Sequence, residues 1–153
     1  MDKPLSLKSA RTLRITYSLP ISRTSKFWEG LKEGKVYATT CTKCKKLHFP
    51  PVADCGACGS SEVEWIELDG ECEVVTFTQV FVKPASFSEE PAYIVAIARL
   101  KEGVKALAWL TGVEREDVKV GMKVKLAAKV FSDKRVAYEF CLLYTSPSPR
   151  DRS

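Results

Sequence analysis

Four of the six cysteines form two close pairs, Cys41-Thr-Lys-Cys44 and Cys55-Gly-Ala-Cys58, and ten residues separate the pairs. Two residues between cysteines allow both sulfurs of a tight knuckle to point at one ion. The ten-residue spacer allows the second knuckle to face the first across a hairpin. Tetrahedral Zn²⁺ takes four thiolates in this way, at Zn–S distances of about 2.3 Å. The spacing therefore predicts a zinc ribbon with Cys41, Cys44, Cys55 and Cys58 as metal ligands.

Four thiolates close the coordination sphere and leave no open position for water or substrate, so we expect a structural metal. A ribbon of about 34 residues cannot bury enough apolar surface to fold alone, whereas metal binding contributes roughly 10–16 kcal/mol in such modules. Gly56 and Gly59 are expected to supply the backbone freedom of the knuckles. The alternatives are four unrelated core cysteines, a redox Cys-x-x-Cys pair beside a helix, and iron in place of zinc.

The hydrophobic pattern and the charge argue against a membrane protein, a secreted protein and a strongly basic nucleic-acid-binding protein. No apolar run approaches the ~20 residues of a membrane span, and the N-terminus lacks the apolar stretch of a signal peptide. We therefore expect a cytoplasmic protein without membrane association, in which paired cysteines indicate a metal site. The formal charge is +5. Outside residues 141–153, with four thiolates around one Zn²⁺, it falls to about +2, which is not a strong basic footprint.

A short helix is predicted over residues 24–34, where polar residues can cap the start and Gly34 can end it. Phe27, Trp28 and Leu31 share one face of this helix. An aromatic pair on so short a helix must be buried against something. The face either enters the chain's own core or docks another protein, and the sequence leaves both readings open.

After the cysteine-rich segment, β-branched and aromatic side chains predict five strands. These strands span residues 71–82, 92–100, 104–111, 122–130 and 135–140. A tight hairpin joins the second strand to the third, and a helical turn over residues 114–118 separates the third from the fourth. Five strands with a helical element in that place are typical of an OB-fold barrel.

The residues that commonly carry catalysis are missing. His48 is the only histidine, and as a fifth ligand it would be redundant, so we expect an exposed strand histidine. The sequence has no phosphate-binding glycine loop and no nucleophile elbow. Cys72 is expected to be a small core residue. We therefore predict no catalytic residue and no enzyme.

An OB fold with a zinc ribbon also admits a single-stranded nucleic-acid-binding protein. Such proteins stack bases on aromatic residues beside Lys and Arg on the second and third strands. Here these strands offer only Tyr93 and Trp109 with Arg99 and Lys105, so nucleic acid is the less favoured partner. One face of the same strands carries small side chains that could meet another surface or fill the barrel interior; these are Ala96, Ala98, Ala106 and Ala108.

The two ends of the chain differ from the middle. Residues 1–23 are polar and basic, which favours a solvated tail, with docking to an acidic partner as the alternative. Residues 141–153 resemble the translation of a sequencing-library adapter, so we leave them out of the fold. A natural disordered Ser/Pro/Arg tail is the alternative. On the adapter reading, Cys141 is not natural and the natural C-terminus lies beyond Phe140.

Several short motifs stand in an order that is similar to one family. They are Phe27–Lys35, the first cysteine knuckle, Phe49–Pro51, Cys55–Ser60, Glu64-Trp65, Asp69-Gly70, Val75–Thr78, Pro91–Tyr93 and Gly121–Val124. Together they resemble the zinc-ribbon plus OB-fold family catalogued as domain of unknown function thirty-five. The resemblance covers residues from about 24 to 140, most of the chain.

The resemblance implies an accessory subunit. Members of this family sit beside thiolase-superfamily enzymes, including archaeal acetoacetyl-CoA thiolase and hydroxymethylglutaryl-CoA synthase. They bridge subunits there, and the OB domain is implicated in handling coenzyme A. The metal ligands carry over to the four paired cysteines, and the helix with Phe27, Trp28 and Leu31 becomes a candidate partner-binding element. No coenzyme A contact carries over residue by residue. In addition, Asp69–Glu73 replaces a more glycine-rich turn and strand start, which argues against a backbone-mediated ligand role for this turn.

These observations predict a mainly β fold with a short N-terminal helix, a rubredoxin-like zinc ribbon and a five-stranded OB-fold barrel. The expected parts are a basic segment and helix (1–34), the ribbon (35–68), the OB-fold domain (69–140) and a non-native tail (141–153). The expected function is that of a non-catalytic scaffold with structural Zn²⁺. Its expected partners are a thiolase-superfamily enzyme, hydroxymethylglutaryl-CoA synthase, and coenzyme A or acyl-CoA.

Overall fold

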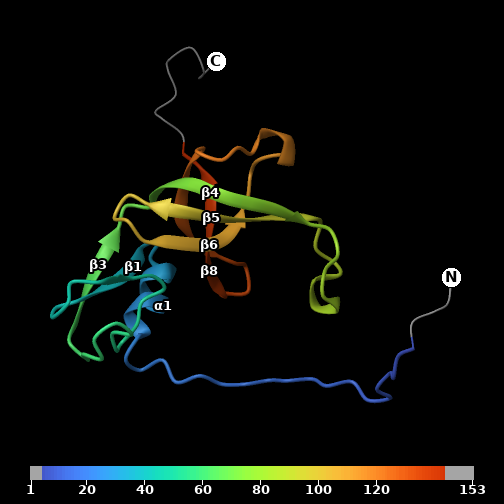
Figure 1. The fold of residues 1–153 in the computed structure, drawn as a ribbon, viewed down its shortest axis with the longest axis horizontal. Coiled ribbons are helices and arrows are strands. Elements are labelled where there is room, and N and C mark those ends of the chain that lie inside the picture. Colours follow the sequence, from blue (N-terminus) through green and yellow to red (C-terminus); the bar gives the residue numbers. More distant parts are fainter. Residues whose placement is uncertain (1–4, 144–153) are drawn as a thin grey trace, which may run out of the picture.

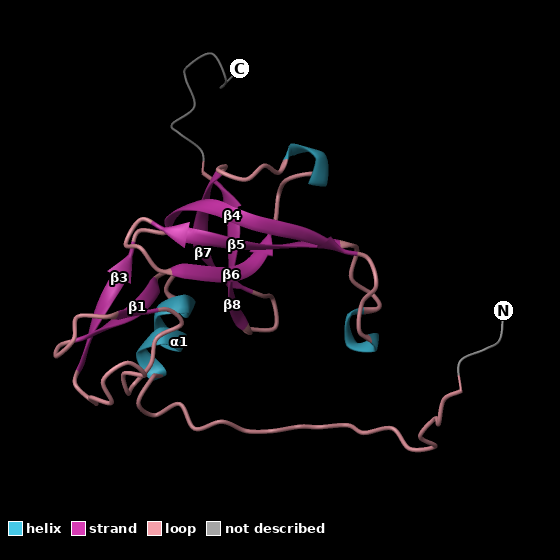
Figure 2. Cartoon of the chain, in the orientation of Figure 1, coloured by secondary structure: helices cyan, strands magenta, loops and turns pink. Residues whose placement is uncertain are grey.

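The computed structural model describes residues 5–143, in which one helix precedes a small sheet and a closed barrel (Figures 1 and 2). The helix and the ribbon strands are α1 (Ser25–Lys32), β1 (Val36–Cys41), β2 (Leu47–His48) and β3 (Val63–Leu68). The barrel strands are β4 (Glu71–Val80), β5 (Tyr93–Leu100), β6 (Lys105–Leu110), β7 (Lys123–Val130) and β8 (Val136–Leu142). Two short 3-10 helices, η1 (Ala85–Phe87) and η2 (Arg115–Asp117), lie in the connections. The predicted fold class is confirmed.

The ribbon is a three-stranded antiparallel sheet with the strand order β2-β1-β3. β1 and β3 pair over their full length, from Val36–Leu68 to Cys41–Val63. The fully buried Thr39 connects this sheet to the segment that leads into the second knuckle. Its hydroxyl donates to the Val52 carbonyl oxygen at 3.1 Å and accepts from the Val52 amide at 3.0 Å.

The barrel closes in the order β4-β5-β6-β8-β7. Its inner wall carries the four alanines of β5 and β6, Ala96, Ala98, Ala106 and Ala108, which are all buried. Of the two readings left open for these residues, the structure therefore selects the barrel interior. Small side chains are needed there because Phe140, Leu126 and Leu100 already fill the space, each with at most 1% exposure.

The turn between ribbon and barrel requires glycine at Gly70. This residue has φ +87°, and a Cβ atom there would overlap the Leu126 carbonyl oxygen. The Gly70 carbonyl oxygen in turn accepts the Leu126 amide at 2.8 Å. The turn is thus built into β7, and the Asp69 carboxylate accepts the Glu71 amide at 2.9 Å beside it.

Helix α1 lies between the ribbon and the barrel (Figure 1). Its first candidate partner residue, Phe27, instead meets Phe49 of the ribbon at 6.2 Å and Tyr138 of the barrel at 5.9 Å between ring centroids. Phe49 and Tyr138 also contact each other at 5.2 Å. Phe27 is 4% exposed and Leu31 is 0% exposed, so both belong to the chain's own core, whereas Trp28 is 36% exposed. Only Trp28 of the predicted docking face is on the surface.

The described segment before α1, residues 5–24, forms no helix or strand and runs away from the body as an extended trace (Figure 1). At the other end, β8 continues to Leu142, two residues past the predicted strand end. Most of the predicted adapter-derived tail, residues 144–153, lies outside the described residues. Within residues 5–143, no helix has the length and apolar character to cross a membrane.

Candidate metal centre and partner surface

The structure brings the four predicted ligands together. The sulfur atoms of Cys41, Cys44, Cys55 and Cys58 all lie within 4.8 Å of one another. The sulfurs of Cys41 and Cys58 are 3.5 Å apart, and those of Cys44 and Cys55 are 3.6 Å apart. Four sulfurs at about 2.3 Å from one tetrahedral ion stand about 3.8 Å apart. These separations bracket that value, so the donor set fits one tetrahedral metal ion.

The two knuckles have the same backbone hydrogen bonds. The amides of Lys45 and Gly59 each donate at 2.9 Å to the carbonyl oxygen of the first cysteine of their knuckle. Both residues adopt positive φ, at 65° and 76°. The expectation for Gly59 is thus confirmed, but that for Gly56 is wrong, because Gly56 does not take a positive φ. The equivalent left-handed position in the first knuckle is filled by a lysine, which the sequence pattern does not signal.

His48 was expected to be an exposed strand residue, and this expectation is wrong. Its side chain is half-buried in β2, and Nε2 lies 3.3 Å from the Cys55 sulfur. Two hydrogen bonds to this sulfur lower the pKa of the Cys55 thiol to about 5; the larger effect comes from the Cys58 amide and the next from the His48 ring. His48 thus supports a ligand from outside the four-sulfur set. Hydrogen bonds of this kind orient metal ligands in proteins.

A groove opens where β6 and β8 diverge. These strands pair only between Leu110 and Phe140, and the space beside the pair forms a groove of about 880 Å³. Six aromatic side chains line it: Trp28, Phe87, Tyr93, Trp109, Phe131 and Tyr138. Tyr93 and Trp109 stack at 4.1 Å with an interplanar angle of 11°. Both aromatic residues were identified from the sequence, but the separation of β6 and β8 that exposes them was not predicted.

Both signs of charge surround this groove. Its cationic side chains are Arg115, Lys129 and Arg135, and its acidic ones are Glu90, Glu114 and Glu139. Lys129 and Glu139 pair with each other at 3.4 Å. The basic residues considered for nucleic acid, Arg99 and Lys105, lie opposite each other across β5 and β6 and do not line the groove. The groove is therefore aromatic and close to neutral.

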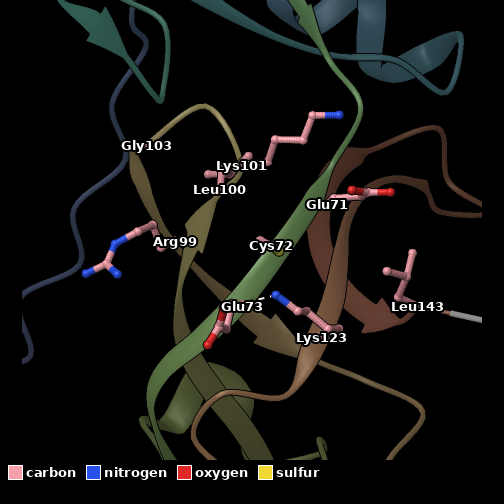
Figure 3. A pocket seen from close by; sticks show the side chains of 9 residues that line it. All are labelled: Glu71, Cys72, Glu73, Arg99, Leu100, Lys101, Gly103, Lys123 and Leu143. Carbon is pink, nitrogen blue, oxygen red and sulfur yellow. Dashed lines mark hydrogen bonds and ion pairs between the residues drawn. The ribbon is translucent and has the colours of Figure 1, made fainter.

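A second hollow of about 390 Å³ lies beside β4 (Figure 3). Two of its charged side chains pair with each other, Glu73 with Lys123 at 3.0 Å. Cys72 lies at its floor, 4% exposed, and its thiol donates to the Val124 carbonyl oxygen at 3.3 Å. Burial raises the pKa of this thiol to about 12. Cys72 is thus a neutral core residue, as predicted, and not a nucleophile.

The geometry agrees with matches to known families. Residues 28–64 match the family model described as the ChsH2 rubredoxin-like zinc ribbon domain, and residues 65–129 match the ChsH2 C-terminal OB-fold domain. A DUF35 domain-containing scaffold protein of Pyrococcus furiosus is 35% identical over 107 residues, which cover 69% of this chain and 77% of the relative. The chain belongs to the DUF35 family. The predicted resemblance is thereby confirmed.

Two further relatives are similar over most of this chain. A DUF35 domain-containing scaffold protein of Methanocaldococcus jannaschii is 31% identical over 72% of this chain and 80% of its own length. A probable enoyl-CoA hydratase alpha subunit of Thermomonospora curvata is 32% identical, over 69% of this chain but only 33% of that subunit.

Two solved structures share the fold. One, described as an Ltp2-ChsH2(DUF35) aldolase, has a TM-score of 0.68 at 24% identity and covers 84% of this chain and 98% of that one. The other, a DUF35 protein of unknown function from Sulfolobus solfataricus, has a TM-score of 0.56 at 22% identity, over 80% and 86% of the two chains.

Proposed function

We propose that this DUF35 protein is a non-catalytic accessory subunit that holds a thiolase-superfamily acyl-CoA enzyme. The observation that carries the proposal is the aromatic groove between β6 and β8, with the exposed Trp28 at its margin. Aromatic residues on an open surface are typical of protein interfaces and their energetic centres. The names of the relatives, two scaffold proteins and an enzyme subunit, favour the same class of function.

The ribbon holds one structural Zn²⁺ in this proposal. Its ligands are the four clustered cysteines, whose sulfur separations fit one tetrahedral ion. The ion would stabilise the ribbon and supply no reaction chemistry, because four protein thiolates leave no position for a substrate. Metal analysis of the purified chain tests this part directly: we expect one zinc per chain, and iron at that stoichiometry would contradict it.

The groove also suits a coenzyme A thioester carried by the partner enzyme. The stacked Tyr93–Trp109 pair offers a flat aromatic surface to an adenine ring. Arg115 and Arg135 line the same groove, and since Arg135 already pairs with Asp133 at 2.6 Å, Arg115 is the leading candidate to meet a phosphate oxygen. In this arrangement the accessory subunit and its partner share the acyl-CoA, and hydroxymethylglutaryl-CoA synthase is the candidate second partner that would receive it.

The stacked aromatic pair favours one alternative, a single-stranded nucleic-acid binder. Such proteins combine stacking platforms with a positively charged groove. Here the three acidic side chains of the groove offset its three cationic ones, so the groove lacks the continuous positive charge that follows a nucleic-acid backbone. The alternative predicts oligonucleotide binding that weakens steeply with salt. Retention of the protein on an oligonucleotide at low salt would favour it over the accessory-subunit proposal.

Co-expression of the full chain with the thiolase-superfamily genes of its own genome tests the leading proposal. We expect co-elution at defined stoichiometry in size-exclusion chromatography with mass detection. Trp28→Ala should weaken the complex about tenfold or more, as at other aromatic interface centres. Phe81→Ala is the matched control, since Phe81 is 70% exposed and does not line the groove.

Two results would contradict the proposal. One is elution of soluble, zinc-loaded protein as a lone 17.1 kDa species beside every candidate partner. The other is turnover of acyl-CoA by the purified chain alone, which would make it an enzyme in its own right.

A further inference from the structure

The segment before α1 alternates apolar and polar residues. Leu13, Ile15, Tyr17, Leu19 and Ile21 are separated by Arg14, Thr16, Ser18 and Pro20. The five apolar side chains are 82%, 67%, 75%, 70% and 44% exposed. A period of two places all five on one face of an extended chain. We call residues 13–21 the alternating segment.

This pattern differs from that of a solvated tail. Segments that stay in solution are poor in aromatic and β-branched residues, whereas five of these nine residues are large and apolar. Half-buried strands carry such alternation because one face packs on a core and the other meets water. The overall basic charge of residues 1–23 conceals the pattern, which is why composition alone suggests a solvated tail.

Because of Pro20, only one edge of the segment has an unbroken row of backbone N–H donors when the segment forms a strand. In a strand, the N–H groups of alternate residues point to the same edge. The edge with the amides of Leu13, Ile15, Tyr17 and Leu19 is complete. The opposite edge is interrupted because proline has no N–H, and prolines in sheets lie on edge strands. The segment is therefore suited to be the last strand of a sheet and not an inner one.

The chain's own sheets do not take up the segment. Neither sheet of the described residues includes it among its strands. Pairing between the segments of two copies would give a two-stranded ribbon, which is marginally stable in water. Addition to the sheet of a different protein avoids this difficulty, because that sheet already has several strands.

The position of the segment favours the same partner as the groove. Its end is fixed to the ribbon, because Arg23 donates to both oxygens of the Asp54 carboxylate at 2.9 and 3.1 Å. Trp28, at the margin of the groove, follows seven residues after Ile21. We propose that the alternating segment adds as an edge strand to an open sheet of the partner enzyme, an inference that rests on the proposed function above.

The test compares two variants of the full chain in binding to the co-purified thiolase-superfamily enzyme. The first replaces the apolar face (Leu13→Ser, Ile15→Ser, Tyr17→Ser and Leu19→Ser). The control replaces the polar face (Arg14→Ser, Thr16→Ser and Ser18→Ala). Because these side chains are exposed, both variants should fold as the parent does. We expect the first to bind at least about tenfold more weakly and the control to change by less than about twofold.

Amide exchange by nuclear magnetic resonance distinguishes a strand from a general apolar contact. In the complex, the amides of residues 13, 15, 17 and 19 should be protected, and those of 14, 16 and 18 should exchange freely. Uniform protection or none would overturn the proposal.

The remaining outcomes separate the two proposals. If the parent binds the enzyme and the apolar-face variant binds equally well, strand addition is wrong and the accessory function stands. If the parent forms no complex, both fall. If the parent instead forms a dimer that the apolar-face variant loses, the occupant is a second copy and the inference is overturned.

Discussion

The Nε2 atom of His48 lies 3.3 Å from the sulfur of Cys55. This contact joins the single histidine of the chain to one of the four clustered thiols. It also links β2, which is only two residues long, to the second knuckle.

Replacing His48 should loosen the metal without removing it. Loss of a hydrogen bond to a metal ligand commonly costs 10–100-fold in metal affinity, so we expect His48→Ala to lower zinc affinity about tenfold. Competition with a chromogenic chelator measures this. His48→Gln, which retains a side-chain N–H donor, should recover part of the loss, and an unchanged affinity in both variants would show that the contact is incidental.

Removing a ligand should unfold the ribbon. Cys55→Ser leaves three thiolates and an incomplete site, so we expect zinc to fall below one per chain and the amide signals of β1 and β3 to collapse. Metal binding in such modules is coupled to folding and contributes roughly 10–16 kcal/mol. Cys72→Ala is the control, because Cys72 lies outside the cluster, and it should retain one zinc per chain.

Alanine substitutions in the turns at Gly70 and Gly103 allow the cost of backbone strain to be measured apart from the cost of close packing. Both have positive φ, at 87° and 101°, but only Gly70 has neighbouring atoms where a Cβ would be placed. Gly103→Ala should cost about 1–2 kcal/mol of unfolding free energy. Gly70→Ala should cost clearly more, because the Leu126 carbonyl must also move. Urea denaturation of the zinc-loaded variants measures both, and equal losses would contradict the argument.

Phe27 and Trp28 are neighbours in sequence but should behave differently. Phe27→Ala removes a buried ring from between ribbon and barrel and should cost about 3–5 kcal/mol. Trp28 is 36% exposed, so Trp28→Ala should cost less than about 1.5 kcal/mol and act mainly on partner binding. Thermal unfolding of the isolated chain gives the comparison. A large loss of stability for Trp28→Ala would assign it to the core instead.

Cys72 should resist alkylation and make stability fall at high pH. Burial raises the pKa of its thiol from 9.0 to about 12. Below the unfolded value both states hold the proton, so its contribution is constant. Above it the unfolded thiol ionises first, and folding stability should decline toward pH 12. Iodoacetamide at pH 8.5 should spare Cys72 in native protein and label it in denaturant.

The sequence predicted the metal cluster well because the spacing of its ligands is a local property. The strands were also predictable from their side chains, and all five barrel strands end within two residues of the predicted bounds. Which face of each strand lies inside the barrel was not predictable. Alternation shows that Ala96 and Ala98 share a face but does not show whether that face is inside or outside, which depends on barrel closure.

Contacts between distant segments account for the other differences. His48 reaches Cys55 because the ribbon hairpin brings them together, and no local pattern records this. The burial of Phe27 likewise depends on Phe49 and Tyr138, which come from the ribbon and the barrel. The groove arises because β6 and β8 meet at only one residue pair, and strand patterns contain no information about where neighbouring strands separate.

The aromatic contact of Phe27, Phe49 and Tyr138 has a consequence for the order of events in the cell. Tyr138 forms part of the groove wall, while Phe49 lies between the two cysteine pairs of the ribbon. If the ribbon needs its ion to fold, as proposed above, a newly made chain without the ion would lack an ordered ribbon. It would also lack the Phe49 contact that supports Tyr138 in the groove wall. We expect metal insertion to come before association with a partner, so that zinc supply controls how many complexes a cell can assemble.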